Sequence, residues 1–259
     1  MNVFAFPRFS LRAIAVWRRN FLVWRKLAIP SLLGNLADPM IYMFGLGYGL
    51  GSMLPSINGL SYIAFLSAGT LCASTMNAAT FEALYSAFSR MHVQKTWEAL
   101  LNAPLALDDV VAGEWLWAAS KSMLSGTAIL IVITALGFVH SPLALWVLPV
   151  VFLTGLCFTG MGLIVNALAP SYDFFMYYFT LVITPMILLS GVFFPFDQLP
   201  AAAQIVAHCL PLSHAVALVR PLVNGTVPDA ALLHIAVLAG IAFVAFWIAL
   251  ALTRRRLLR

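Results

Sequence analysis

Charged residues are scarce in this chain, and their scarcity settles its class. Only 9% of the 259 residues are charged, whereas 63% are hydrophobic. Apolar windows of about twenty residues recur along the chain, the length an α-helix needs to cross the hydrocarbon core of a bilayer. The formal charge of +5 would suggest nucleic acid in a soluble protein, but here the basic residues lie at the ends of apolar windows. We therefore expect an all-α membrane protein with no nucleic-acid partner.

The chain also lacks the motifs of most catalytic sites. It has no Gly-x-x-x-x-Gly-Lys-Ser/Thr phosphate loop and no polar stretch long enough for a nucleotide-binding domain, so we expect no ATP hydrolysis by this chain. Neither metal-ligand spacing nor a nucleophile with a neighbouring base is visible. The three cysteines, Cys72, Cys157 and Cys209, cannot all pair, which argues against a disulfide framework. We expect no catalytic residue, no metal and no cofactor on this chain.

The hydropathy pattern predicts six transmembrane helices within a single domain, residues 1–259. The predicted spans cover about residues 32–54, 62–85, 115–139, 143–169, 174–194 and 231–252. An even number of spans places both termini on one side of the membrane. The basic segments 8–26, 90–95 and 254–259 then share that side, which the positive-inside rule identifies as the cytoplasm. The short connections on the other side leave no room for a folded outer domain.

Residues 1–30 predict an amphipathic helix that lies in the membrane interface. One helical face carries apolar and aromatic side chains, and the opposite face carries cations. The first face holds Ile14, Trp17, Phe21, Trp24 and Ala28, and the second holds Arg12, Arg19 and Lys26. We expect the rings at the acyl boundary and the cations near anionic lipid headgroups. A flexible basic tail is the alternative.

The polar segment 86–114 interrupts the apolar pattern between spans two and three. Residues 93–101 predict a short amphipathic helix that ends before Pro104, because a proline disfavours helical geometry in the residue before it. Its apolar positions are Val93, Trp97, Leu100 and Leu101, whereas Lys95 and Glu98 face elsewhere. Asp108 and Asp109 mark the start of the next helix. The apolar face needs lipid headgroups or a partner protein to cover it, and a solvated loop is the alternative.

The segment 195–229 is too apolar for an ordinary loop. Pro200, Pro211 and Pro221 divide it into pieces of roughly ten residues, about half a membrane thickness. We predict two short re-entrant helices in the outer leaflet before span six. A broken seventh span would place the basic segment 254–259 outside, so we reject it on charge.

Few ionisable or aromatic residues stand out as candidates for function. Glu82 and Lys121 lie on consecutive antiparallel spans, where they predict an ion pair that acts as a structural clasp or a gate latch. We place Asp38 at the start of span one, toward the cytoplasmic side, and find no carboxylate at mid-membrane depth for a proton-driven carrier.

Two further features have both a structural and a functional interpretation. The aromatic start of span five, with Phe174, Tyr177 and Tyr178, predicts either a lipid-facing belt or part of a substrate path. Span one contains overlapping Gly-x-x-x-Gly pairs between Gly45 and Gly51, which serve internal packing or a seam with a second copy.

Three stretches of this sequence resemble the membrane subunits of type-2 ABC exporters, and among them the NodJ-like permeases of bacterial inner membranes. They are WRKLAIPSLLGNLADPMIYMFGLGYGLG (24–51), FEALYSAFSRMHVQKTWEALLNAPL (81–105) and LLSGVFFPFDQLPAAAQIVAHCLPLSHAVALVRPLVNG (188–225). The resemblance implies that segment 86–114 contains a coupling helix, which docks on a separate ATPase subunit. It also implies that the exporter has two copies of this ATPase, and that these copies bind the ATP and Mg. It also implies a second copy of this chain and a lipo-chitooligosaccharide-like substrate.

The same scaffold suits other cargo, so the substrate stays open at this point. Capsular or O-antigen polysaccharide and small hydrophobic drugs are alternatives. A non-transporting integral membrane protein, whose segment 86–114 rests on lipid, is the alternative from a different class.

Overall fold

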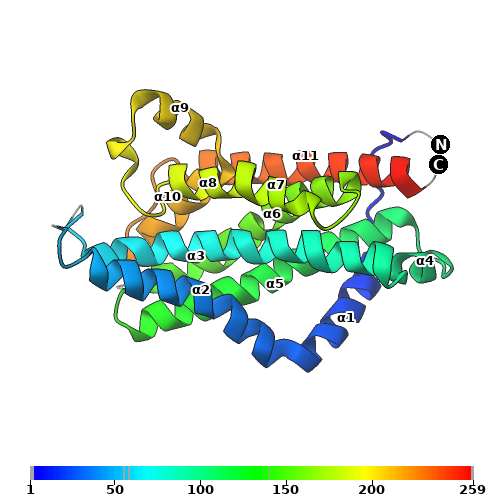
Figure 1. Cartoon of the computed structure of the whole chain (residues 1–259), viewed down its shortest axis with the longest axis horizontal. Coiled ribbons are helices and arrows are strands. Elements are labelled where there is room, and N and C mark those ends of the chain that lie inside the picture. Colours follow the sequence, from blue (N-terminus) through cyan, green and yellow to red (C-terminus); the bar gives the residue numbers. More distant parts are fainter. Residues whose placement is uncertain (1–2, 55, 58, 140, 258–259) are drawn as a thin grey trace.

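Helices dominate the computed structural model, which describes residues 3–54, 56–57, 59–139 and 141–257. Within these ranges the only β-type pairing is an isolated bridge between Ile57 and Leu60. Long helices run side by side along the longest axis of the molecule (Figure 1). The predicted all-α class is confirmed. Residues 1–2 and 258–259 of the predicted single domain, and with them Arg259 of the basic C-terminal segment, lie outside the described residues.

Six helical segments occupy the positions of the six predicted spans. They are α2 (Ala28–Gly49), α3 (Tyr62–Phe81), α5 (Leu107–Ala135), α6 (Val147–Leu168, preceded by the 3₁₀ turn Pro142–Trp146), α7 with α8 (Phe174–Tyr178 and Thr184–Leu189, joined by a π turn over Phe179–Ile183) and α11 (Ala231–Leu257). By length and apolar character, four stretches qualify as spans, namely 13–49, 107–135, 142–168 and 231–257. The bent pair that precedes α11 would make a fifth. The count of six stays a prediction.

Helix α3 falls outside that set for a physical reason. It lies at the centre of the bundle, in contact with α2, α5, α6 and α10 (Pro211–Asn224). Almost its whole surface is buried by protein, and it is rich in Ala, Ser and Thr. Small residues let neighbouring helices approach closely, and a helix that meets protein instead of lipid needs little hydropathy of its own.

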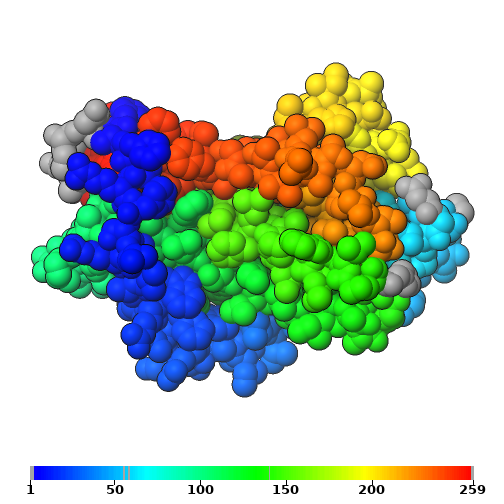
Figure 2. All heavy atoms as spheres, turned by 180° about the vertical axis from the view of Figure 1, so that it is seen from behind, coloured from blue at the N-terminus to red at the C-terminus, as the bar shows by residue number. Residues whose placement is uncertain are grey.

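The first helix packs on protein through the face that we expected to meet lipid. α1 (Ala13–Trp24) is followed by a 3₁₀ turn (Arg25–Leu27) and then α2, and the two helices form an elbow that projects from the bundle (Figures 1 and 2). The rings of Trp17, Phe21 and Trp24 surround Trp117 of α5, with centroid distances of 6.5, 6.3 and 5.8 Å. These rings are partly buried against protein, and their predicted place at the acyl boundary stays a prediction.

The exposed face of α1 is also different from the prediction. Ile14, which was grouped with the tryptophans, is 51% exposed on the other side, beside Leu11 and Leu22. Trp117 explains the difference, because a protein ring offers a closer fit for three aromatic side chains than a lipid surface does. The outward face is thus aliphatic, with Arg18 beside it.

The segment before α11 forms two helices, α9 (Ala201–Cys209) and α10, which meet at 87°. Their boundaries follow Pro200 and Pro211, as predicted, but Pro221 lies inside α10 and does not divide it. α9 projects from the end of the bundle, whereas α10 is buried against α3, α6 and α11 (Figure 1). Arg220 of α10 lies 3.8 Å over the Phe65 ring and donates to the carbonyl oxygen of Gly191 at 2.6 Å.

The N- and C-terminal segments meet at the end of the bundle where α4 (Thr96–Leu101) lies (Figure 1). Arg254 pairs with Asp108 at the start of α5, with a distance of 2.5 Å between Nη2 and Oδ2. Arg254 also donates to the carbonyl oxygen of Ala5 at 2.6 Å. α5 begins at Leu107, as the two aspartates predicted, and Asp109 accepts the backbone N–H of Ala106 at 3.0 Å.

The close contact between α1 and α5 depends on Gly113. A Cβ atom added there would lie 2.5 Å from the Val16 Cβ atom, which is closer than real contacts allow. We expect Gly113→Ala to destabilise the protein by about 1–3 kcal/mol, the usual cost of overpacking. Thermal unfolding of the detergent-purified protein measures this. Gly240→Ala is the matched control, because a Cβ atom there meets nothing within 4 Å. Equal unfolding temperatures for the two variants would contradict the account of how α1 is docked.

Candidate functional site

The connection between α3 and α5 is a rigid elbow built mainly on α3. Two π-helical turns, Glu82–Ser86 and Ser89–Val93, extend α3 as far as Val93. Lys95 then takes a left-handed conformation with φ of 55°, and α4 begins at Thr96. The predicted start of this helix at Val93 is therefore wrong, because Val93 ends the preceding helix. The predicted stop before Pro104 is confirmed, since α4 ends at Leu101.

Trp97 of α4 points into its own chain. Its side chain is 2% exposed, and its Nε1 donates to the Glu114 Oε1 atom at 3.2 Å. Leu100 and Leu101 are partly buried and pack against the same cluster of α1, α5 and α11 side chains. The prediction that Trp97 anchors a partner protein is wrong, because the apolar face of α4 is already covered.

The solvent side of the elbow is formed by three other predicted docking residues. Val93, Lys95 and Glu98 are all more than half exposed. Lys95 and Glu98 pair with each other across a distance of 2.7 Å. We call this surface, which Val93, Lys95 and Glu98 form, the elbow tip.

Four charged side chains form a buried cluster behind the elbow, which we call the ion cluster: Glu82, Arg90, Glu114 and Lys121. The Arg90 Nη2 atom lies 2.9 Å from Glu82 Oε1 and 2.6 Å from Glu114 Oε2. The Lys121 Nζ atom lies 2.7 Å from Glu82 Oε2. The structure thus brings together Glu82 and Lys121, the two residues predicted to pair.

Two indoles complete the hydrogen bonding of the ion cluster. The Trp117 Nε1 atom donates to Glu82 at 2.8 Å, and Trp97 donates to Glu114. Burial lowers the pKa of Arg90, but the charges of Glu114 and Glu82 outweigh this effect and the net pKa is raised. Arg90 therefore stays protonated. Buried charges that are paired and fully hydrogen bonded hold their elements in one arrangement, and here they join the end of α3 to α4 and α5.

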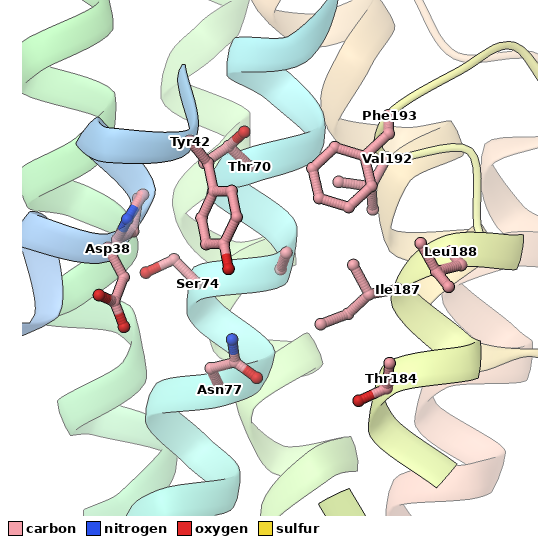
Figure 3. A pocket seen from close by; sticks show the side chains of 12 residues that line it. Asp38, Tyr42, Thr70, Ser74, Asn77, Thr184, Ile187, Leu188, Val192 and Phe193 are labelled. Atoms are coloured by element: carbon pink, nitrogen blue, oxygen red, sulfur yellow. The ribbon is translucent and has the colours of Figure 1, made fainter. Parts of the chain in front are cut away.

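A groove opens on the side of the bundle between α2, α3 and α8, with a cavity of about 380 Å³. Figure 3 shows that its polar side chains come from three helices. They are Asp38 and Tyr42 of α2, Thr70, Ser74 and Asn77 of α3, and Thr184 of α8, with Ile187, Leu188 and Phe193 as apolar neighbours. We call this the α2–α3–α8 groove.

The position of Asp38 differs from the prediction. α2 begins at Ala28, so Asp38 lies in the middle of this helix and not at its start. The carbonyl oxygen of Asn35, one turn earlier, lies 3.5 Å from Ser74, which itself lies near the middle of α3. In the described part of the chain the Asp38 carboxylate has no hydrogen-bond or ion-pair partner. A carboxylate at mid-membrane depth faces water, a partner or a ligand, because burial in lipid is costly.

The aromatic residues that we considered for the substrate path lie outside the groove. Phe174 and Tyr177 are exposed, with ring centroids 6.2 Å apart. Tyr178 is buried in the core of the bundle, so its predicted place in a passage is wrong. The groove uses the C-terminal half of the same segment, where Thr184, Ile187 and Leu188 lie on α8 after the π turn.

The overlapping glycine pairs of α2 divide between two faces. A Cβ atom at Gly47 would lie 2.8 Å from Ile63, so this glycine serves internal packing. Gly45 and Gly49 have nothing within 4 Å. They share a face of α2 with Asp38 and Tyr42, since spacings of three and four residues return to one side of a helix.

Comparison with known proteins identifies the class. A model of the ABC-2 type transporter family matches residues 12–223, so the chain belongs to that family. This membership indicates a transport subunit and not a nucleotide-binding catalytic unit, and it implies pairing with an ABC ATPase subunit. Within the described residues, no group of three or more His, Cys, Asp or Glu side chains could hold a metal ion.

Individual relatives narrow the class to NodJ-like permeases. The chain is 52% identical to nodulation protein J of Rhizobium leguminosarum bv. viciae, over 100% of both chains. It is 51% identical to nodulation protein J of Rhizobium meliloti (strain 1021), over 100% of this chain and 98% of the relative. It is also 25% identical to the inner membrane transport permease YadH of Escherichia coli (strain K12), over 78% of each chain. The predicted resemblance is confirmed, and the chain is an integral membrane subunit of an ABC exporter.

Removing one member of the ion cluster leaves its charged partners buried without that counter-charge. We expect Glu114→Gln to destabilise the protein by about 3–5 kcal/mol, because Arg90 loses a buried counter-charge and the amide offers one acceptor oxygen where the carboxylate offers two. The double variant Arg90→Met with Glu114→Met is expected to lose less than the sum of the single variants. Thermal unfolding of the purified protein measures both.

The matched control is Glu98→Gln, which removes an exposed ion pair and is expected to change stability by about 0–1 kcal/mol. Additive losses in the double variant, or an equal loss in the control, would contradict the assignment of Arg90 and Glu114 as one coupled unit.

Proposed function

We propose that this chain is one half of the membrane domain of an ATP-driven exporter in a bacterial inner membrane. It crosses the membrane six times, with both termini and the α4 elbow in the cytoplasm. Three observations support this topology: six helical segments lie at the predicted spans, the terminal segments meet beside α4, and the basic segments 90–95 and 254–256 lie at that end, from which α1 runs with the cations of segment 8–26. α9 and α10 then lie in the outer leaflet, where packing of α10 on protein satisfies its backbone.

The assembled exporter contains two copies of this chain and two copies of a separate ATPase, which carry the ATP and Mg. The open face of α2 supports a second copy as the neighbour. Gly45 and Gly49 allow close approach of a helix, and Asp38 lies on the same face. A copy that approached along this face would cover the groove, and it would give the Asp38 carboxylate an enclosed polar passage in place of lipid.

The substrate that we propose is an amphipathic lipo-oligosaccharide of the lipo-chitooligosaccharide class, taken from the cytoplasmic leaflet. The α2–α3–α8 groove carries this proposal, since hydroxyl, amide and carboxylate groups stand beside apolar side chains at mid-membrane depth. Such a surface suits sugar hydroxyls and an acyl chain together. The relatives at 52% and 51% identity carry the name nodulation protein J, and we propose a nodulation signal as the cargo. Polysaccharide or small hydrophobic drugs remain the alternatives on the same scaffold.

The elbow tip is the proposed contact with the ATPase. Val93, Lys95 and Glu98 reach solvent there, and the rim charges select the partner. Trp97 acts as a positioning residue, because it fixes α4 on Glu114 from within. A displacement of the elbow tip by the ATPase would then be transmitted through the ion cluster to α3 and α5. Because α3 forms one wall of the groove, the displacement would change the shape of the groove.

Charge reversal at the elbow tip tests the ATPase contact. We expect Lys95→Glu and Val93→Asp to lower the amount of ATPase that co-purifies with the permease by about tenfold, which corresponds to about 1.4 kcal/mol. The matched control is Asp197→Lys, a charge reversal of equal size before α9 at the other end of the molecule. Unchanged recovery with both tip variants would favour an elbow that rests on lipid.

Filling the groove tests the substrate path. Asn77→Phe places a ring in the cavity, and we expect export to fall to near background while the amount of protein in the membrane is kept. Lipid extracts from outside cells with and without the gene, and with each variant, give the readout. Ile131→Phe is the control, because Ile131 is exposed on α5 outside the groove. Identical extracts with and without the gene would refute the proposed substrate.

A further inference from the structure

A second cavity lies between the α1–α2 elbow and the end of α3, beside the ion cluster. Its volume is about 420 Å³, and its walls come from α1, the 3₁₀ turn before α2, the extended end of α3 and α5. Three cations line it, Arg19, Arg90 and Lys121, against one carboxylate, Glu82. Glu114 lies behind Arg90 and balances it. The remaining positive charge belongs to Arg19.

Arg19 has no carboxylate partner among the described residues. Its Nη1 atom donates to the Asn20 Oδ1 atom at 2.9 Å, and its Nη2 atom lies 3.4 Å from the Thr96 hydroxyl. Both acceptors are neutral. The guanidinium group is therefore held toward the cavity by weak acceptors, and its charge is left uncompensated.

Asn20 provides a second, independent sign of a missing ligand. Its side chain is 3% exposed, and its Nδ2 group has no hydrogen-bond acceptor. Because Oδ1 already accepts from Arg19, the orientation of the amide is fixed and the unpaired group is a donor. Asn20 also lines this cavity. Buried donors without acceptors are rare in folded proteins, and this one sits beside an uncompensated cation.

The side of the cavity formed by the α1–α2 elbow is apolar, whereas Ser86, Ser89 and Gln94 line the side formed by the end of α3. Val23 and Leu27 line the apolar side and are more than half exposed on the outer side of the elbow, next to the Trp24 ring. A ligand that satisfies all of these groups has a negatively charged acceptor at one end and a hydrocarbon part at the other. A zwitterionic choline headgroup fits less well, because its ammonium would face Lys121 and Arg90.

We propose that this cavity binds the phosphate of an anionic phospholipid, with Arg19 and the Asn20 Nδ2 group as its ligands and the acyl chains beside Val23 and Leu27. The lipid would seal the elbow between α1 and α2 next to the ion cluster. The proposal does not depend on which substrate the exporter carries.

Native mass spectrometry of the full-length purified protein tests this, with phosphatidylglycerol, phosphatidylcholine or glycerol 3-phosphate added. We expect one phosphatidylglycerol retained per chain, and retention of phosphatidylcholine lower by about tenfold, because its phosphate can still reach Arg19 but its ammonium would face Lys121 and Arg90. Glycerol 3-phosphate, which has the same phosphate without acyl chains, is expected to bind far more weakly. Equal binding of glycerol 3-phosphate would overturn the lipid assignment in favour of a soluble anion.

Variants of two neighbouring arginines distinguish binding of the lipid in this cavity from general attraction of anionic lipid to the basic surface of α1. Arg19→Gln is expected to abolish the preference for phosphatidylglycerol, whereas Arg18→Gln, which removes the same charge from the exposed face of α1, is expected to keep it. Asn20→Leu, which removes both the unpaired donor and the acceptor that orients Arg19, should weaken retention as well and covers the case in which Arg19→Gln folds poorly. Equal losses in the two arginine variants, or full retention in both Arg19→Gln and Asn20→Leu, would overturn the proposal.

Discussion

The structure depends on one buried guanidinium group. Arg90, at the end of α3, holds Glu82 of its own helix and Glu114 of α5 at hydrogen-bonding distance. Trp97 of α4 donates to the same Glu114. Together with the Glu82–Lys121 pair and the buried Trp97 side chain, these contacts hold three helices in one arrangement, at the end of the bundle where the terminal segments also lie.

This arrangement makes the α4 elbow a rigid lever and not a flexible loop. Its apolar face packs against the rest of the chain, so that Val93, Lys95, Glu98 and their exposed neighbours form the surface that can contact another protein. The same helix α3 carries Arg90 at one end and Ser74 and Asn77 of the groove in its middle. A displacement at the elbow therefore reaches the groove along a single continuous helix, without a hinge between them.

The sequence predicted most of the helices, because apolar windows, prolines and acidic N-termini are local signals. It also predicted the pair Glu82 and Lys121, since both are ionisable and lie near the same end of neighbouring helices. The partners Arg90 and Glu114 were missed because they are 24 residues apart in a polar segment, where no spacing announces a contact. Periodicity identified apolar side chains of α1 and α4 but could not say what they contact. Their contacts are on α5, where Trp117 packs against the rings of α1 and Glu114 accepts the indole N–H of Trp97 in α4. Asp38 was misplaced because hydropathy located the start of α2 four residues too late.

We expect the ion cluster to transmit motion from the α4 elbow to the α2–α3–α8 groove. The most direct test uses the assembled exporter with the double variant Arg90→Met and Glu114→Met, which removes the Arg90–Glu114 connection between the end of α3 and α5 and leaves Glu82 paired with Lys121. ATP hydrolysis and export are measured on the same preparation, in membranes that contain equal amounts of both subunits. The account predicts that the ATPase stays bound and hydrolyses ATP while export is lost. Export at the wild-type rate with the link removed would contradict it.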